Sequence, residues 1–245
     1  MKSIKYILIG YGQMGHMVEK IADNRGHVLS FIIDNISDWK RIDQKAKESD
    51  IAIDFSLPEV AVDNIIKCFK AGIPMVSGTT GWYDRLPEVE KACHRHNGTL
   101  FYAPNFSLGM NMVFKMNKIL AQMTNKTAYE ARLSEVHHIH KKDMPSGTAL
   151  RLAADIIDLN SKYTEWTGSK EHTTNQLWID SIRLNEVPGT HEIIYSSAED
   201  EICLRHTAYN RDGFALGAWV AAEFLLGKTG IYTMQDLIKS HINGD

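Results

Sequence analysis

The chain has 245 residues, of which 44% are hydrophobic and 23% are charged, and its formal net charge is −3. This composition is that of a globular protein and excludes a disordered one, and the charge gives no general attraction to polyanions or anionic membranes. We therefore expect no nucleic-acid partner and no membrane partner, so that any affinity for an anionic ligand must be local.

The chain start and the cysteines indicate a cytoplasmic protein. The apolar run Tyr6–Ile9 is too short for the core of a signal peptide, and no stretch approaches the roughly 18 apolar residues of a membrane span. The cysteines, Cys68, Cys93 and Cys203, are odd in number and widely spaced, with no CxxC pair. We expect them to be reduced thiols.

Apolar runs and helix-like segments alternate over the first 105 residues. Ser56 and Glu59 have the spacing of a capping box at a helix start, and Gly72 is placed to end that helix. Strand, helix and strand repeated in this way predict a parallel sheet with right-handed crossovers. The predicted strands are 6–9, 28–33, 51–55, 74–77 and 99–102, and the predicted helices are 13–24, 56–71 and 84–97.

The alternating pattern ends after residue 106. Later in this part of the chain, three predicted strands follow one another without intervening helices. We therefore expect an α/β chain with a Rossmann-like parallel-sheet domain and a second α+β domain carrying a mainly antiparallel sheet. The polar stretch 160–176 is the candidate mobile loop. The later predicted elements are the helix 107–124, the strand 128–138, a helix after Ser146, the strands 178–184, 191–197 and 201–208, and the helices 215–226 and 233–242.

A GxGxxG motif lies between the first predicted strand and the first predicted helix. It consists of Gly10, Tyr11, Gly12, Gln13, Met14 and Gly15. Glycines there allow a tight turn and a close approach of backbone amides to a pyrophosphate. Asp34 ends the second strand, where a carboxylate accepts from the ribose hydroxyls of a dinucleotide. The alternative is a glycine-rich turn without a ligand.

The residue after Asp34 bears on the choice of nicotinamide cofactor. It is Asn35, where an arginine would bind a 2′-phosphate. We expect NADH or NADPH, with NADH favoured, although Lys40 or Arg41 could still reach a 2′-phosphate.

Two further segments follow strands at the carboxyl edge of the predicted sheet, where such folds bind ligands. One is Gly78, Thr79, Thr80 and Gly81, and the other runs from Tyr102 through Ala103, Pro104 and Asn105 to Phe106. We expect them to flank the nicotinamide ring. A plain tight turn is the alternative for the first.

Four basic residues lie close together at His137, His138, His140 and Lys141. On an extended segment His137 and His138 point to opposite faces, and no cysteine accompanies them, so we expect no metal. A solvated cationic edge strand is the other alternative. The segment that follows argues against such a strand.

The residues Ser146, Gly147 and Thr148 precede an apolar, helix-periodic run. A helix that begins there presents backbone amides, hydroxyls and the positive end of its dipole, which together suit a carboxylate. A nicotinamide fold with such a pocket implies hydride delivery to an acidic, conjugated substrate, with proton transfer from a histidine or lysine.

The segment Glu135–Ala149 resembles the signature E-x-H-H-x-x-K-x-D-x-P-S-G-T-A of the dihydrodipicolinate (4-hydroxy-tetrahydrodipicolinate) reductases and matches every fixed position. The resemblance extends over nearly the whole chain. Segments 10–15, 54–58, 78–81 and 103–111 are similar to the cofactor edge of that family. Further matches are Ser181, Arg183, Gly189, His191, Arg211 and Phe214, and the departures are Tyr102, Pro104 and Glu192.

The resemblance implies roles for some of the matched residues. His137 would be the catalytic acid/base and Lys141 a proton donor, while His138, Ser146, Gly147 and Thr148 would bind a dicarboxylate substrate. The cofactor would contact residues 10–15, 34, 78–80 and 102–105. Residues 1–106 with 212–245 would form the dinucleotide-binding domain, and 107–211 the substrate-binding and oligomerisation domain of a homotetramer.

The implied reaction is the NADH- or NADPH-dependent reduction of a cyclic imine dicarboxylate in lysine and diaminopimelate synthesis. An amino-acid dehydrogenase of similar two-domain plan is one alternative, although it has no need of the His137–His138 pair. A non-catalytic, dinucleotide-sensing regulator is the other.

Overall fold

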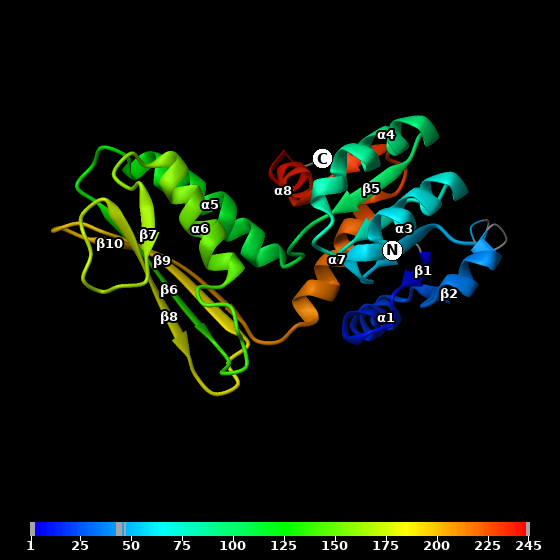
Figure 1. The fold of residues 1–245 in the computed structure, drawn as a ribbon, viewed down its shortest axis with the longest axis horizontal. Helices are drawn as coiled ribbons and strands as arrows, with labels where there is room; N and C mark the ends of the chain where they lie inside the picture. Colours follow the sequence, from blue (N-terminus) through cyan, green and yellow to red (C-terminus); the bar gives the residue numbers. More distant parts are fainter. Residues whose placement is uncertain (1–2, 43–45, 47, 244–245) are drawn as a thin grey trace. The chain divides into compact units, whose positions relative to one another are not determined.

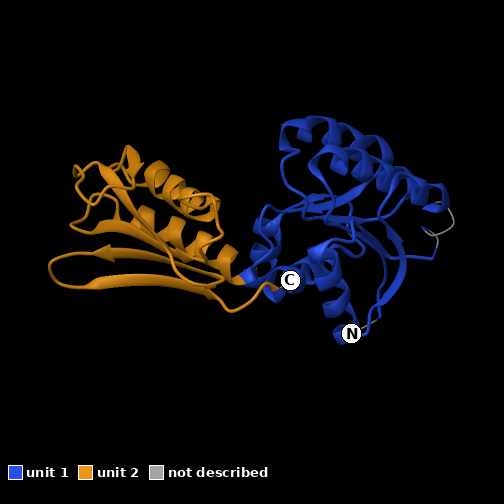
Figure 2. Cartoon of the chain, turned by 60° about the horizontal axis from the view of Figure 1, so that its bottom comes forward, with its two compact units in different colours: residues 1–108, 212–245 blue, residues 109–211 orange. Residues whose placement is uncertain are grey.

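The computed structural model describes residues 3–42, 46 and 48–243. Residues 1–2, 43–45, 47 and 244–245, which the predicted first domain includes, lie outside the described residues. The chain divides into two units, residues 1–108 with 212–245 (unit 1) and residues 109–211 (unit 2), which are coloured separately in Figure 2.

Unit 1 contains, within its described residues, a six-stranded parallel sheet in the order β11-β5-β4-β3-β1-β2 (Figure 1). Helices separate most successive strands, so each crossover returns the chain to the same end of the sheet. The strands are β1 (Lys5–Ile9), β2 (Val28–Ile33), β3 (Ile51–Asp54), β4 (Met75–Ser77), β5 (Thr99–Tyr102) and β11 (Gly230–Tyr232). The last was not predicted, because its three residues are too short to show a period.

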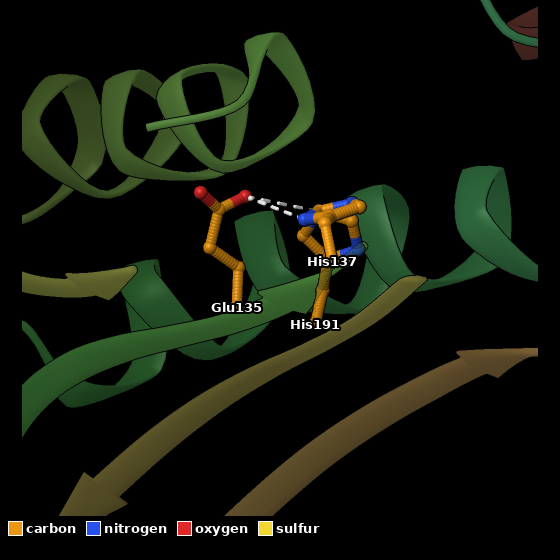
Figure 3. Close-up of side chains that lie close together, drawn as sticks. All are labelled: Glu135, His137 and His191. Atoms are coloured by element: carbon orange, nitrogen blue, oxygen red, sulfur yellow. Dashed lines mark ion pairs between the residues drawn. The ribbon is translucent and has the colours of Figure 1, made fainter. Parts of the chain in front are cut away.

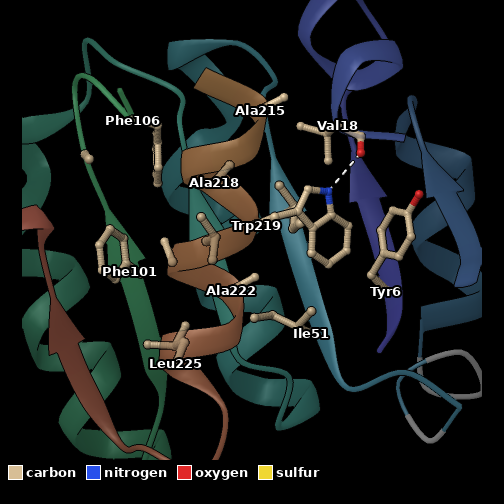
Figure 4. Packing of buried hydrophobic residues seen from close by; sticks show 14 of the residues in the cluster. Tyr6, Val18, Ile51, Phe101, Phe106, Ala215, Ala218, Trp219, Ala222 and Leu225 are labelled. Carbon is tan, nitrogen blue, oxygen red and sulfur yellow. Dashed lines mark hydrogen bonds between the residues drawn. The ribbon is translucent and has the colours of Figure 1, made fainter. Parts of the chain in front are cut away.

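Two apolar clusters form the core of unit 1, and adjacent residues of β1 enter different ones. Figure 4 shows Trp219 packed beside Tyr6 and below Val18, with its Nε1 donating to the carbonyl oxygen of Val18 at 2.9 Å. The helices of the unit are α1 (Gln13–Arg25), η1 (Ile36–Arg41), α3 (Pro58–Ala71), η2 (Tyr83–Arg85), α4 (Leu86–His96), α7 (Asp212–Leu225) and α8 (Met234–Asn243).

The predicted capping box at Ser56 is wrong. Leu57 is the N-cap of α3 and makes no side-chain capping bond, and Pro58 occupies the first turn. The hydroxyl of Ser56 instead donates to Oδ1 of Asp54 at 2.6 Å. Proline suits this first turn because it lacks the N–H that a cap would satisfy. The predicted end at Gly72 is confirmed, with φ +70°.

Unit 2 packs α5 (Leu108–Thr124, which begins at the last residue of unit 1) and α6 (Gly147–Leu159) against a five-stranded sheet in the order β10-β9-β6-β8-β7. Alternate residues of β6 are buried, as the period of a strand with one covered face requires. The strands are β6 (Glu130–His137), β7 (Glu165–Thr167), β8 (Gln176–Arg183), β9 (Gly189–Ser196) and β10 (Glu201–Ala208).

The predicted α/β fold class is confirmed, and the second sheet is mixed, with its two longest strand pairings antiparallel. β9 pairs antiparallel with β6 and β10, whereas β8 pairs parallel with β6 and β7. The helix α6 lies between β6 and β8 in the chain and acts as a crossover, which makes these two strands parallel. The predicted mobile loop 160–176 contains β7, a three-residue strand at the sheet edge.

All three cysteines are free thiols, as expected; Cys68 and Cys93 are buried and Cys203 is exposed. Within the described part of the chain, no helix combines the length and the apolar character that crossing a membrane requires.

Candidate active site

At the glycine turn between β1 and α1, a Cβ added at Gly12 would meet nothing within 4 Å, which leaves room for a ligand beside the main chain. Gly10 has φ +82°, and a Cβ there would lie 2.5 Å from the carbonyl oxygen of Phe55. A Cβ at Gly15 would lie 2.5 Å from the carbonyl oxygen of Gly10, so only glycine lets the helix pack this close. Gly12, the N-cap of α1, offers no side-chain acceptor to the amides of the first turn. The turn therefore fits a pyrophosphate.

Asp34 lies beside this turn, just after β2. Its Oδ1 accepts a 2.8 Å hydrogen bond from the backbone N of Tyr11. The side chain of Asn35 is used locally, since it accepts from the backbone N of Ser37 at 3.0 Å and caps η1. Of the two residues that follow β2, Asp34 is the one with a carboxylate, and its side chain is exposed.

The carboxyl ends of β3, β4 and β5 lie in register. Asp54 is paired with Ser77, and Ser77 with Tyr102. The segments 78–81 and 102–106 consequently begin at one edge of the sheet. Within them Thr79 and Ala103 are buried. The structure brings these predicted segments together, while the side chain of Thr79 faces inward.

A buried carboxylate that the sequence analysis missed holds this edge. Oδ2 of Asp54 accepts from the hydroxyls of Ser77 at 2.9 Å and Thr79 at 2.7 Å, and Oδ1 accepts from Ser56. Burial raises the pKa of Asp54, and these hydrogen bonds offset that effect only in part. Nε1 of Trp82 donates to the carbonyl oxygen of Thr79 at 2.8 Å. Asp54 therefore connects the ends of β3 and β4 and the segments that follow them.

In unit 2, two neighbouring strands bring Glu135, His137 and His191 together, a group we call the acid–histidine cluster (Figure 3). Glu135 and His137 are two residues apart on β6 and so share its buried face. Glu135 is the direct cross-strand partner of His191 on β9. The two imidazole rings lie 4.9 Å apart at 70°.

Glu135 is fully buried and its two oxygens have different neighbours. Oε1 accepts from the backbone N of Ser146 at 3.0 Å and from Nη2 of Arg183 at 3.3 Å. Oε2 lies 3.4 Å from Nδ1 of His137 and 3.7 Å from Nε2 of His191. Burial alone raises the pKa of Glu135, but the hydrogen-bond donors around it outweigh burial and hold that pKa well below its usual range.

His191 is held neutral. Burial, and next the charge on His137, lower its pKa to about 4. Its Nε2 lies 3.2 Å from Oγ of Ser146, the N-cap of α6, and that Oγ also accepts from the backbone N of Ala149. The predicted helix start at Ser146 is confirmed, and it connects directly to the acid–histidine cluster.

Lys141 lies in the segment between β6 and α6 and pairs with a carboxylate of the same segment. Its Nζ is 2.8 Å from Oδ1 of Asp143. Oδ2 of Asp143 accepts from the backbone N of Gly147 at 3.3 Å. The Lys141 hydrogen bond, foremost, lowers the pKa of Asp143. The predicted proton donor Lys141 and the predicted carboxylate-binding residue Gly147 thus both bind the carboxylate of Asp143 in this structure.

Arg183 ties this segment to the strands. Besides Glu135, it donates to the carbonyl oxygens of Lys141 at 3.4 Å and Asp143 at 2.5 Å. Arg183 is also the parallel cross-strand partner of His137. Sequence reasoning gave Glu135, Arg183 and His191 no role, although the spacing of Glu135 and His137 was a signal for the first.

The remaining predicted residues lie on the same segment. His138 is half-buried, with a shielded Nδ1 that has no hydrogen-bond partner among the described residues, and Thr148 is half-buried in the first turn of α6. His140 is exposed and pairs with Glu186 at 3.2 Å. The sequence analysis assigned His140 no task, and its partner lies outside the acid–histidine cluster.

The acid–histidine cluster is also the group of side chains, among the described residues, that could ligate a metal, since the three donor atoms lie within 4.8 Å of one another. It shares only His137 with the four basic residues for which the sequence analysis expected no metal. The Arg183 guanidinium and the N-terminus of α6 both place positive charge at Glu135, which disfavours a further dication.

Two sequence-family profiles match the chain. The one described as dihydrodipicolinate reductase, N-terminus, matches residues 4–106, and the one described as dihydrodipicolinate reductase, C-terminus, matches residues 109–238.

Similar proteins carry the same description. The 4-hydroxy-tetrahydrodipicolinate reductase of Christiangramia forsetii is 45% identical over 94% of this chain and 96% of its own, and that of Methanopyrus kandleri is 36% identical over 79% and 72%. A dipicolinate-bound dihydrodipicolinate reductase structure from Paenisporosarcina sp. TG-14 has the same fold, with a TM-score of 0.76, 19% identity, and coverage of 95% of this chain and 98% of that one. The chain belongs to the dihydrodipicolinate (4-hydroxy-tetrahydrodipicolinate) reductase family, NAD(P)H-dependent oxidoreductases of lysine and diaminopimelate biosynthesis.

Proposed function

We propose that this chain reduces 4-hydroxy-tetrahydrodipicolinate to tetrahydrodipicolinate, with the reacting ring held at the acid–histidine cluster. The observation that carries the proposal is the meeting of Glu135, His137 and His191 at the N-terminus of α6, beside Lys141. This arrangement places proton-transfer groups next to amides and a lysine that suit carboxylates. The product's two carboxylates require such a setting.

The nicotinamide cofactor supplies the hydride when it is bound. The residues proposed to hold it are those of the glycine turn, Asp34, and the segments 78–80 and 102–105. In the substrate domain, the 4-hydroxyl group leaves as water, with one proton given to it and one removed from the ring by His137 acting as acid/base. Lys141 then donates the proton that neutralises the negative charge that hydride addition leaves on the ring. His138, Ser146, Gly147 and Thr148 bind the substrate carboxylates, and that of Asp143 must leave Gly147 and Lys141 for them.

NADH is the proposed cofactor in preference to NADPH. The exposed carboxylate of Asp34 would repel a 2′-phosphate. Asn35 is occupied in capping η1, and the Arg41 guanidinium lies 5.2 Å from the centroid of the Phe31 ring. The residues after β2 therefore offer a ribose-binding carboxylate more readily than a phosphate-binding cation.

We further propose that the protein is cytoplasmic and forms a homotetramer. The family resemblance implies that it assembles through residues 107–211. Three free cysteines suit a reducing compartment. Size-exclusion chromatography with light scattering tests the assembly, and a monomer at micromolar concentration would contradict it.

The reaction is tested by a coupled assay that presents freshly generated 4-hydroxy-tetrahydrodipicolinate with NADH or NADPH. We expect substrate-dependent loss of NADH absorbance and slower loss with NADPH. A protein that binds NADH without any turnover would be a dinucleotide-sensing regulator. Turnover of an amino acid in its place would indicate a dehydrogenase of similar plan.

A further inference from the structure

We infer that Glu135 is the positioning residue for His137, holding the neutral imidazole with its proton on Nδ1 and its Nε2 free to exchange a proton with the substrate. The inference rests on the proposed role of His137. It assigns a task to a buried acid whose chemistry the proposed reaction does not otherwise use.

Two shielded atoms face each other at this contact. Oε2 of Glu135 and Nδ1 of His137 are both cut off from solvent and lie 3.4 Å apart, and neither has a partner in hydrogen-bond geometry among the described residues. A buried carboxylate oxygen and a buried ring nitrogen without partners are costly. An N–H at Nδ1 that points at Oε2 satisfies both, and this contact selects the Nδ1–H tautomer.

The orientation of the carboxylate is fixed from its other side. Oε1 is engaged by the backbone N of Ser146 and by Arg183, so the carboxylate cannot rotate to bring a different oxygen to His137 without losing two donors. A planar group held in this way presents a fixed acceptor to the ring. The N-terminus of α6 thereby connects to the orientation of His137.

The opposite ring nitrogen lies next to Gly189 on β9. A Cβ added at Gly189 would lie 3.0 Å from Nε2 of His137, and Gly189 has φ +152°. The absence of a side chain at this position keeps the Nε2 edge of the ring uncovered. Nδ1 is thus the anchored side of the imidazole and Nε2 the side available for chemistry.

Several other charged or titratable groups surround the ring. His191 on β9 is held neutral and adds no competing positive charge. Arg183 on β8 acts on the far oxygen of Glu135. The charges of Lys141, before α6, and of His206, on β10, bear on His191. Lys141 in turn pairs with Asp143. Glu135 is the anion in contact with the ring, so it supplies the counter-charge for an imidazolium at His137.

The variant Glu135→Gln tests this assignment sharply. Ser146 and Arg183 are donors, so the glutamine carbonyl oxygen must face them and its NH₂ must face Nδ1 of His137. That arrangement turns Nδ1 into an acceptor and moves the ring proton to Nε2. We expect ¹⁵N NMR of labelled imidazoles to show Nδ1–H for neutral His137 in the wild type and Nε2–H in Glu135→Gln.

The kinetic expectation is a fall in kcat on the order of 10²-fold or more, as when the orienting acid of a catalytic histidine becomes an amide. The KM for the substrate and the Kd for NADH should change by less than about threefold, because cofactor binding is proposed for unit 1. Glu186→Gln is the matched control, since it removes an exposed acid from His140 and should leave kcat unchanged.

Failure of this inference and failure of the proposed function are distinguishable. Nε2–H in the wild-type protein would overturn the role of Glu135 whether or not any variant folds. A fall in kcat without reversal of the tautomer in Glu135→Gln would also overturn it, since the acid would then act only through the fold. Absence of reductase activity in the wild type would instead reject the proposed reaction, while the tautomer would still test the contact.

Discussion

Two buried carboxylates, one in each unit, differ in what surrounds them. Asp54 at the edge of the parallel sheet accepts from neutral groups, among them the hydroxyls of Ser56, Ser77 and Thr79, and its pKa is raised by burial. Glu135 faces Arg183 and two histidines, and its pKa is lowered because hydrogen bonds from His137, Ser146 and Ser181 outweigh burial. The hydroxyl groups around Asp54 serve to hold a loop in its conformation. The charged and titratable groups around Glu135 keep this carboxylate ionised beside residues proposed to transfer protons.

The largest predicted effect is at Lys141, which lies in the unit that contains Glu135. We predict that Lys141→Ala lowers kcat on the order of 10²- to 10³-fold, because the group that neutralises the charge left by hydride addition is lost. The Kd for NADH, measured by fluorescence titration, should stay within about twofold of wild type. Lys142→Ala is the matched control, since Lys142 is adjacent and exposed. An unchanged kcat in Lys141→Ala would remove the lysine from the mechanism.

The neutral state of His191 predicts a pH dependence of stability. With its pKa lowered to about 4 from 6.5, the folded protein excludes a proton that the unfolded chain binds below about pH 6.5. The unfolded state then binds more protons, so stability falls as the pH drops from 6.5 to 4, by up to about 3 kcal/mol from this group. Urea unfolding of wild type and His191→Asn across this range tests it. Equal pH slopes would contradict the prediction.

Asp34 sharpens the contrast between cofactor binding and chemistry. Asp34→Ala should weaken NADH binding about tenfold, because a charge-assisted hydrogen bond to the ribose is lost. We expect kcat at saturating NADH to stay within about twofold, and NADPH to gain relative to NADH. Steady-state kinetics with both cofactors measures this. A comparable loss of kcat at saturation would place Asp34 in the chemical step.

Asp54 gives the smallest predicted effect. Asp54→Asn keeps an acceptor and lets its NH₂ donate to a hydroxyl oxygen, so we expect a loss of about 1 kcal/mol in the free energy of unfolding. The kcat at saturating NADH should be nearly unchanged. A loss of kcat as large as that predicted for Glu135→Gln would show that the two buried acids do not differ in the way their surroundings indicate.

The sequence was sufficient to predict the longer helices and strands and the local motifs. It did not predict contacts between residues that are far apart in the chain. Glu135 and His191 are cross-strand partners only because of the register between β6 and β9, which one sequence does not reveal. The role of Asp54 was hidden because two of its donors, Ser77 and Thr79, follow a different strand. The short strands β7 and β11 carry too few residues for a period.

The most direct test is the coupled assay run side by side on wild type, Glu135→Gln and Asp54→Asn. It monitors the loss of NADH absorbance with freshly generated 4-hydroxy-tetrahydrodipicolinate. We predict rapid turnover by wild type, near-wild-type turnover by Asp54→Asn at saturating NADH, and a fall on the order of 10²-fold or more in Glu135→Gln. Absence of turnover in a wild-type protein that binds NADH would contradict the proposed function.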